Sequence, residues 1–243
     1  MTTNLGPTLG NGKICYVEIP ALDIERSSKF YHHVFGWKLR TRGDGAIAFD
    51  DGINEVSGTW VLGRKSHTEQ GLILSIMVDS VAETTTRIVA QKCKMVKDRS
   101  TETEVIAWFS DPAGNIIGLY QHPGGGDGKI CYLEIPTDDT SRSARFYKAV
   151  FNWPVREDNN GNAAFDDGVG VVSGMWETGF TPSIEPGLMI YVMMDDVAAT
   201  TETIKAAGGQ IVQPIGADAP EITARFADPF GNVLGLYQPP KRA

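Results

Sequence analysis

The chain has little of what marks several large classes of protein. Three cysteines in 243 residues do not make a disulfide framework. No apolar stretch approaches the roughly 18 residues that a membrane span needs, and the first thirteen residues lack the apolar core of a signal peptide. No run of basic residues occurs, and the net charge of −8 argues against a nucleic-acid surface. These features predict a cytoplasmic protein without a nucleic-acid or membrane partner.

What the chain does have is a long internal repeat. GKICYVEIP begins at Gly12 and GKICYLEIP at Gly128, an offset of 116 residues (128 − 12). The same offset relates FDDG at 49–52 to FDDG at 165–168, and the closing DP motifs at Asp111 and Asp228 are offset by 117 (228 − 111). A repeat of this length predicts a duplicated domain. We expect one domain at 1–123 and another at 124–243, joined by the glycines at 124–126.

Each half carries the same predicted order of elements twice. Alternating and helical apolar patterns predict strand, helix and three strands, and then the same set again. In the first half the helices are expected over residues 26–35 and 81–92, and the strands at 14–20, 37–41, 46–50, 55–61, 72–78, around 95, 104–109 and 116–121. The fold class is therefore predicted to be α+β, a tandem duplicate in which each half contains two βαβββ modules.

These motifs resemble the vicinal oxygen chelate superfamily. The quoted features are FYHHVFGW and FYKAVFNW in the two halves, VDSV and MDDV after a later strand, and a closing DPAGNIIGLYQ or DPFGNVLGLYQ. That superfamily includes glyoxalase I, bleomycin-resistance proteins, fosfomycin-resistance enzymes and extradiol dioxygenases, and the chain is similar to its tandem bacterial members. The resemblance implies that paired modules form open barrels around a cavity, with helices outside. Whether each barrel closes within a half or by exchange between halves stays open.

The resemblance also implies four inward positions that hold metal ligands in metal-dependent members. The equivalent residues here are Tyr16, Gly58, Ile73 and Gly118 in the first half and Tyr132, Gly174, Met189 and Gly235 in the second. None is a histidine, aspartate or glutamate, the donors that a catalytic divalent metal prefers. The four histidines, His32, His33, His67 and His122, have no counterparts in the second half. We therefore expect no metal site and no cofactor.

Other side chains are expected to face the cavities instead. Strand residues two apart share a face, so Glu18 accompanies Tyr16 and Glu134 accompanies Tyr132. Each glutamate is either a hydrogen-bonded structural residue or a polar anchor or general base for a ligand. Aromatic residues are core by default, but a cavity lined by them also suits a flat apolar molecule. The predicted ligand-binding residues are Tyr16, Glu18, Trp60, Trp108, Tyr120, Tyr132, Glu134, Trp176, Tyr191, Arg225 and Tyr237.

The two halves differ at two of these positions. Trp108 corresponds to Arg225, and Ser75 corresponds to Tyr191, so we expect two unlike pockets, the second suited to an anionic group. The function predicted is the binding of a small aromatic or amphipathic organic molecule, for sequestration or for metal-independent chemistry. Two alternatives stay open: a metal-dependent lyase, isomerase or dioxygenase with an unusual site at Glu18 and Glu134, and a structural scaffold. A homodimer is also left open.

Overall fold

The fold consists of four βαβββ modules in sequence. The computed structural model describes residues 6–66, 71–122, 124–157, 162–184 and 187–240, and within them it has four helices and sixteen strands. The first module comprises β1 (Ile14–Ala21), α1 (Ile24–Phe35), β2 (Lys38–Thr41), β3 (Ile47–Asp50) and β4 (Ser57–Leu62). The second comprises β5 (Ile73–Val78), α2 (Val81–Ala90), β6 (Lys94–Asp98), β7 (Val105–Ser110) and β8 (Ile116–Gln121).

The second half repeats this order. The third module comprises β9 (Asp127–Thr137), α3 (Thr140–Phe151), β10 (Val155–Glu157), β11 (Ala163–Asp166) and β12 (Ser173–Thr178). The fourth comprises β13 (Met189–Met193), α4 (Val197–Ala206), β14 (Gln210–Gln213), β15 (Ile222–Ala227) and β16 (Val233–Gln238). The predicted α+β tandem fold is confirmed.

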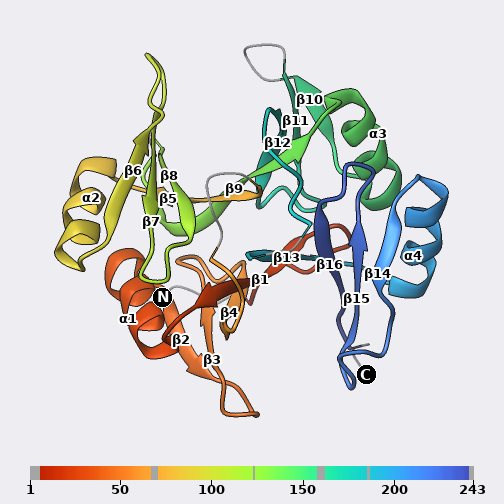
Figure 1. The fold of residues 1–243 in the computed structure, drawn as a ribbon, viewed down its shortest axis with the longest axis horizontal. Coiled ribbons are helices and arrows are strands. Elements are labelled where there is room, and N and C mark those ends of the chain that lie inside the picture. Colours follow the sequence, from red (N-terminus) through yellow and green to blue (C-terminus); the bar gives the residue numbers. More distant parts are fainter. Residues whose placement is uncertain (1–5, 67–70, 123, 158–161, 185–186, 241–243) are drawn as a thin grey trace. The chain divides into compact units, whose positions relative to one another are not determined.

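The strands form two mixed sheets of eight strands each (Figure 1). One sheet has the order β14-β15-β16-β13-β1-β4-β3-β2, and the other has the order β10-β11-β12-β9-β5-β8-β7-β6. The first and last modules thus share one sheet, and the two middle modules share the other. Each sheet therefore combines modules from different halves of the sequence.

The chain divides into two compact units. Unit 1 takes Met1–Thr8, Val17–Glu69 and Ile73–Tyr132, and unit 2 takes Leu9–Tyr16, Gln70–Leu72 and Leu133–Ala243. The start of each opening strand therefore belongs with the other half of the sequence. In unit 2 the residues just before β1 are joined to the end of β13: Gly12 N donates to Met193 O at 2.8 Å, and Met193 N donates to Lys13 O at 2.7 Å.

In unit 1 the segment Gly128–Lys129–Ile130, one of the two GKI segments, is held by the first module. The indole Nε1 of Trp37 donates to the carbonyl of Gly128 at 2.7 Å, and the Asp51 carboxylate accepts from Ile130 N at 3.0 Å. Gly128 has φ +72°, and a Cβ there would lie 2.1 Å from the carbonyl oxygen of Phe35. Only glycine fits this approach.

Unit 2 holds the other GKI segment, Gly12–Lys13–Ile14, in the same way. Trp153 Nε1 donates to the Gly12 carbonyl at 2.6 Å, and Asp167 accepts from Ile14 N at 3.0 Å. Gly12 has φ +80° and lies against the carbonyl of Phe151. The repeated tryptophan and FDDG motifs therefore serve the architecture of both halves.

The helices begin at capping side chains and bury an aromatic stripe. Asp23 caps α1 by accepting from Arg26 N at 3.0 Å, and Gly36 ends it in the left-handed conformation. Tyr31 of α1 stacks on Trp37 with ring centroids 4.7 Å apart, and Trp37 stacks on Phe49 at 4.3 Å. The core of the first module lies between α1 and its strands.

The closing DP motif completes this core. In unit 1 the hydroxyl of Tyr31 donates to the buried Asp111 carboxylate at 3.0 Å, and Asn115 Nδ2 donates to the same carboxylate and to the Pro20 carbonyl. In unit 2 Tyr147, Asp228, Asn232 and Pro136 repeat these bonds. The shared FY and DP.GN motifs are thus explained by one buried hydrogen-bond network per unit.

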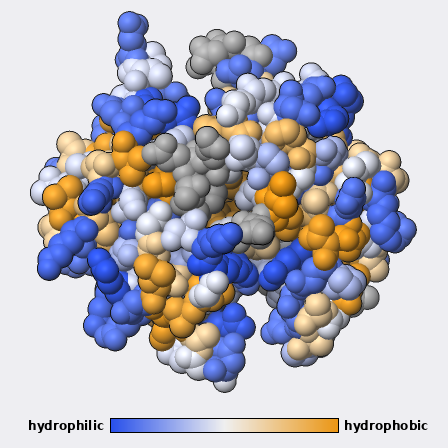
Figure 2. Space-filling model, viewed as in Figure 1, coloured by the Kyte–Doolittle hydropathy of each residue, from blue (hydrophilic) through white to orange (hydrophobic). Residues whose placement is uncertain are grey.

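On the face shown in Figure 2, hydrophilic residues are interspersed with smaller apolar patches. Among the described residues, no helix is both long enough and apolar enough to cross a membrane.

Candidate functional site

In unit 1, strand register aligns four residues on one face of β5, β8, β7 and β6. Gly118 pairs with Ser75 on one side and with Trp108 on the other, and Trp108 pairs with Lys97. The next residue, Phe109, points the opposite way and packs against helix α1. The row therefore lies on the face of the strands away from the unit's helices, which we call the helix-free face.

The glycine in this row lies close against Ser75. A Cβ on Gly118 would lie 2.1 Å from Ser75 Oγ and 3.3 Å from Ser75 Cα. Beside it, Trp108 is only 1% exposed. The Arg99 guanidinium lies 4.5 Å from the Trp108 ring centroid and the Lys97 ammonium 5.4 Å from it. Unit 1 thus presents a buried indole with two cations against it.

Unit 2 has the equivalent row with different chemistry. Gly235 pairs with Tyr191 on one side and Arg225 on the other. A Cβ on Gly235 would lie 2.2 Å from the Tyr191 ring, so the ring occupies the space above the glycine. Arg225 Nη2 donates to the Tyr191 hydroxyl at 3.1 Å. The Tyr16 ring meets Tyr191 edge-on at 6.0 Å between centroids.

Two further residues complete this face of unit 2. Tyr237 packs, partly exposed, against the apolar cluster that contains Tyr191, and burial raises the pKa of its hydroxyl. The neighbouring Cys15 thiol donates to the Tyr191 carbonyl at 3.5 Å, and burial raises its pKa to about 12. Cys15 is therefore an inert thiol at neutral pH, and the chemistry of the face rests on tyrosines and one guanidinium.

Comparison with known proteins decides the family. The model described as Glyoxalase/Bleomycin resistance protein/Dioxygenase superfamily matches residues 13–119 and 129–236. The chain belongs to this superfamily. It is 24% identical over 249 aligned positions to "Putative glyoxylase CFP32" of Mycobacterium tuberculosis, a match that covers 92% of this chain and 94% of that protein.

Solved structures agree on the fold of this superfamily member. Glyoxalase I from Zea mays is similar with a TM-score of 0.71 and 20% identity, covering 93% of this chain and 92% of that one. A "putative dioxygenase from Bacillus subtilis" is similar with a TM-score of 0.70 and 12% identity, covering 95% and 86%. At these identities the likeness shows the shared fold and not a shared reaction.

The residues at the superfamily's metal positions do not fit a metal. Gly118 and Gly235 have no side chain that could act as a ligand. In the described parts of the chain, no three histidine, cysteine, aspartate or glutamate side chains are grouped as a metal would need. His32 and His33 lie on α1, where His32 Nδ1 is 2.8 Å from the Trp37 carbonyl, and His67 lies outside the described residues.

The two opening-strand glutamates have different neighbours. Glu18 forms an ion pair with Arg64, and about a fifth of each side chain is exposed. The residue equivalent to Arg64 in the second half is Phe180, 116 positions on (180 − 64), and Glu134 is only 8% exposed. The Arg64 guanidinium thus holds Glu18 in place, as is expected of either a structural carboxylate or a polar anchor for a ligand.

Trp60 and Trp176 do not lie where the sequence placed them. The Trp60 ring packs 4.9 Å from Phe49 and 5.8 Å from Tyr31 of α1, between the strands and the helix. Trp176 makes the same contacts with Phe165 and Tyr147. The prediction that they line a ligand cavity is therefore wrong, because their face of β4 or β12 is covered by a helix.

The remaining predicted residues lie on or beside the opening and closing strands. Tyr132 on β9 and Tyr120 on β8 are partly exposed in unit 1, and burial raises the pKa of the Tyr120 hydroxyl. The sequence analysis missed Arg64, Lys97 and Arg99. Lys97 and Arg99 lie on and just after β6, the strand that precedes the one carrying Trp108, but their contact with that ring could not be read from the sequence.

Proposed function

We propose that this member of the glyoxalase superfamily binds a small aromatic anion without a metal, on the helix-free face of unit 2. Arg225, Tyr16 and Tyr237 are the proposed contact residues, and Tyr191 holds the arginine. The observation that carries the proposal is the hydrogen bond from Arg225 Nη2 to Tyr191 Oη above Gly235. The free cysteines suit a reducing compartment, which supports a role in the cytoplasm.

The chemistry of this pair favours an anion. The Tyr191 hydroxyl orients the Arg225 guanidinium, whose fork of N–H donors suits a carboxylate or phenolate. The neighbouring rings of Tyr16 and Tyr237 offer aromatic surface for a flat ligand. This combination of aromatic lining and one oriented charge is typical of small-molecule sites.

The face of unit 1 supports a second site of different preference. Trp108 already lies beneath Arg99 and Lys97, so an aromatic ligand would have to compete with an internal ring. Tyr120 and Tyr132 are proposed to contact a ligand there. Glu18 in unit 1 and Glu134 in unit 2 are each proposed to act as a polar anchor rather than a general base.

Binding is tested by thermal unfolding and calorimetry with benzoate, and with benzamide as its neutral analogue. We expect benzoate to stabilise the protein, by about 2.7 kcal/mol at a hundredfold excess over Kd, and benzamide to have a smaller effect. Arg225→Gln should abolish the benzoate shift. Arg156→Gln, an exposed arginine of the same unit, is the matched control and should keep it.

Two outcomes would contradict the proposal. A benzoate shift that survives Arg225→Gln would place the ligand elsewhere, and no shift with benzoate in the wild-type protein would reject an aromatic carboxylate as the ligand. Stoichiometric metal after dialysis, with activity that a chelator removes, would favour the metal-dependent alternative.

A further inference from the structure

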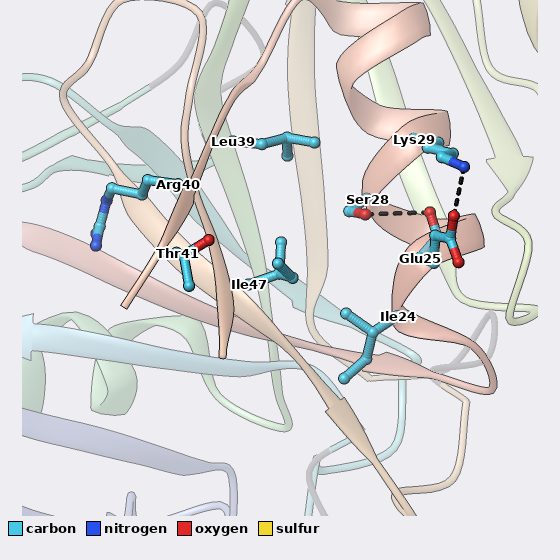
Figure 3. A pocket seen from close by; sticks show the side chains of 8 residues that line it. All are labelled: Ile24, Glu25, Ser28, Lys29, Leu39, Arg40, Thr41 and Ile47. Carbon is cyan, nitrogen blue, oxygen red and sulfur yellow. Dashed lines mark hydrogen bonds and ion pairs between the residues drawn. The ribbon is translucent and has the colours of Figure 1, made fainter. Parts of the chain in front are cut away.

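The first module has a groove on its outer side that is separate from the helix-free faces. It has a volume of about 510 Å³ and lies between the start of α1 and the strands β2 and β3, of which β2 is at the edge of the sheet (Figure 3). Its lining residues are Ile24, Glu25, Ser28, Lys29, Leu39, Arg40, Thr41 and Ile47. This volume lies within the range of about 300–1,000 Å³ that is usual for small-molecule sites.

Three aliphatic side chains give the groove its apolar surface. Ile24 comes from the first turn of α1, Leu39 from β2, and Ile47 from β3, where it pairs with Thr41. Figure 3 shows Ile24 and Ile47 on facing sides of the same space. At the equivalent positions, 116 residues on, the third module has the smaller or more polar Thr140, Val155 and Ala163. The apolar groove is thus a feature of the first module that the repeat itself does not require.

One cation at the rim, Lys29, can meet an anionic group. The other charged residues of the lining are Glu25, which pairs with Lys29, and Arg40, whose side chain lies on the face of β2 opposite to Leu39 and Thr41. The Lys29–Glu25 pair is 2.5 Å long, but its side chains are 72% and 77% exposed, so it rearranges at little cost. Arg40 contacts Asp50 through Nε at 3.3 Å on that opposite face, so the positive charge of the groove comes from Lys29.

We propose that this groove binds an amphipathic anion, an alkyl chain of medium length that ends in a carboxylate. The chain lies against Ile24, Leu39 and Ile47, and the carboxylate lies at Lys29. This site is independent of the proposed aromatic-anion site, because every lining residue belongs to the first module within unit 1.

Decanoate and octanoate are the probes, with binding followed by NMR titration of the full chain. Each buried methylene tightens binding about fourfold, so decanoate should bind roughly fifteenfold more tightly than octanoate. Ile47→Ala copies the third module and should weaken decanoate binding about tenfold. Val155→Ala, an aliphatic truncation in the third module at the position equivalent to Leu39, should leave binding unchanged.

Two surface variants test the charge assignment without disturbing the fold. Lys29→Gln should weaken decanoate binding about threefold, and Glu25→Gln should tighten it about threefold, because it releases Lys29. The proposal is overturned if the two variants shift the Kd in the same direction, or if decanoate binding is insensitive to Ile47→Ala. Self-association that Ile47→Ala abolishes, with no decanoate binding, would assign the groove to a second copy of the chain and also overturn it.

Discussion

The same row of strand positions is built in two ways in the two units. In unit 1 a small residue, Ser75, lies beside the glycine, and the large Trp108 follows on the next strand. In unit 2 the large Tyr191 lies beside the glycine, and Arg225 follows. An aromatic ring is present in both rows, but it has moved from one strand to another.

This difference decides how the positive charge is held in each row. In unit 1 the cations come from β6 and its following loop and rest against the indole. In unit 2 the cation is in the row itself and is oriented by a tyrosine hydroxyl. The duplicated architecture is therefore held by residues that both halves share, while the helix-free faces have diverged in charge and shape.

The largest effect should come from the residues that the two units share. Asp51→Ala leaves the backbone N–H groups of Ile130, Glu55 and Val56 without their carboxylate acceptor, and we expect a loss of about 3–5 kcal/mol in the free energy of unfolding. Asp167→Ala should cost the same, measured by urea unfolding.

The exposed Asp138, which pairs with Arg142, supplies the control, and its replacement by alanine should change stability by less than about 1 kcal/mol. A loss confined to one of the two buried aspartates would show that the GKI segments are not held equivalently.

The next largest effect should be a difference in stability between alanine substitutions at Gly235 and at Gly118. Gly235→Ala drives a Cβ into the Tyr191 ring, which is itself packed, and should destabilise the protein by about 2–3 kcal/mol. Gly118→Ala meets mainly the Ser75 hydroxyl, which can rotate, and should cost about 1 kcal/mol. Thermal and urea unfolding of both variants give the difference.

Adding Tyr191→Ser to Gly235→Ala should recover part of the loss, because the second change recreates the small neighbour found in unit 1. Equal losses at the two glycines, or no recovery in the double variant, would mean that neighbour size does not explain the two rows.

Much of the fold was predictable because its signals are local. Apolar periodicity, caps and glycines gave the order of elements, and the helix expected at 26–35 is observed as Ile24–Phe35. The combination of modules from different halves in each sheet was not predictable. Asp51 binds Ile130, 79 residues away, yet the segment around Ile14 has the same GKIC sequence, so no residue distinguishes the two partners.

The site residues were predictable only where a neighbouring motif fixed the face of the strand on which each side chain lies. Neighbouring motifs fixed the strand positions of Tyr16, Tyr191 and Arg225, but nothing in the sequence placed Tyr16 beside Tyr191 of the other half, where its ring lies. Trp60 was assigned to the wrong face because no neighbouring motif fixed which side chains of β4 lie on which face. The cation–Trp108 contact was missed for a different reason: β6 shifts register between Met95 and Lys97, and a bulge of this kind resets which side chains share a face.

A smaller effect should come from the tyrosine hydroxyl that orients Arg225 in unit 2. Tyr191→Phe keeps the ring above Gly235 and removes the hydroxyl that accepts from Arg225, so we expect a loss of about 1 kcal/mol in stability. Benzoate affinity should fall as well, because the guanidinium loses its orienting partner. Calorimetry measures both. Unchanged affinity would show that Tyr191 does not position Arg225 for a ligand.

The smallest effect concerns two adjacent aspartates in unit 2 whose pKa values move in opposite directions. Burial raises the pKa of Asp167. Burial also acts to raise the pKa of Asp166, but the hydrogen bond from Ser173 and the Arg156 guanidinium outweigh it and hold that pKa below its usual range. The stability contributed by Asp167 is therefore fully present below the unfolded value of about 3.9 and lost as pH rises through the folded pKa. The contribution of Asp166 has the opposite sign: it is present above about 3.9 and lost as pH falls through its folded pKa.

The two contributions offset each other in the total, so they must be resolved residue by residue, by following the side-chain carboxyl carbons with NMR between acid and neutral pH. Asp167 should titrate above about 3.9 and Asp166 below it. Ser173→Ala removes the hydrogen bond of 2.7 Å to Asp166 and should raise the pKa of Asp166 while leaving Asp167 in place. If Asp167 titrated below Asp166, burial could not be the dominant influence at the carboxylate that holds the Gly12–Ile14 segment. Asp167 would then have to be stabilised as an anion by its backbone N–H donors, Ile14 and Val171 among them.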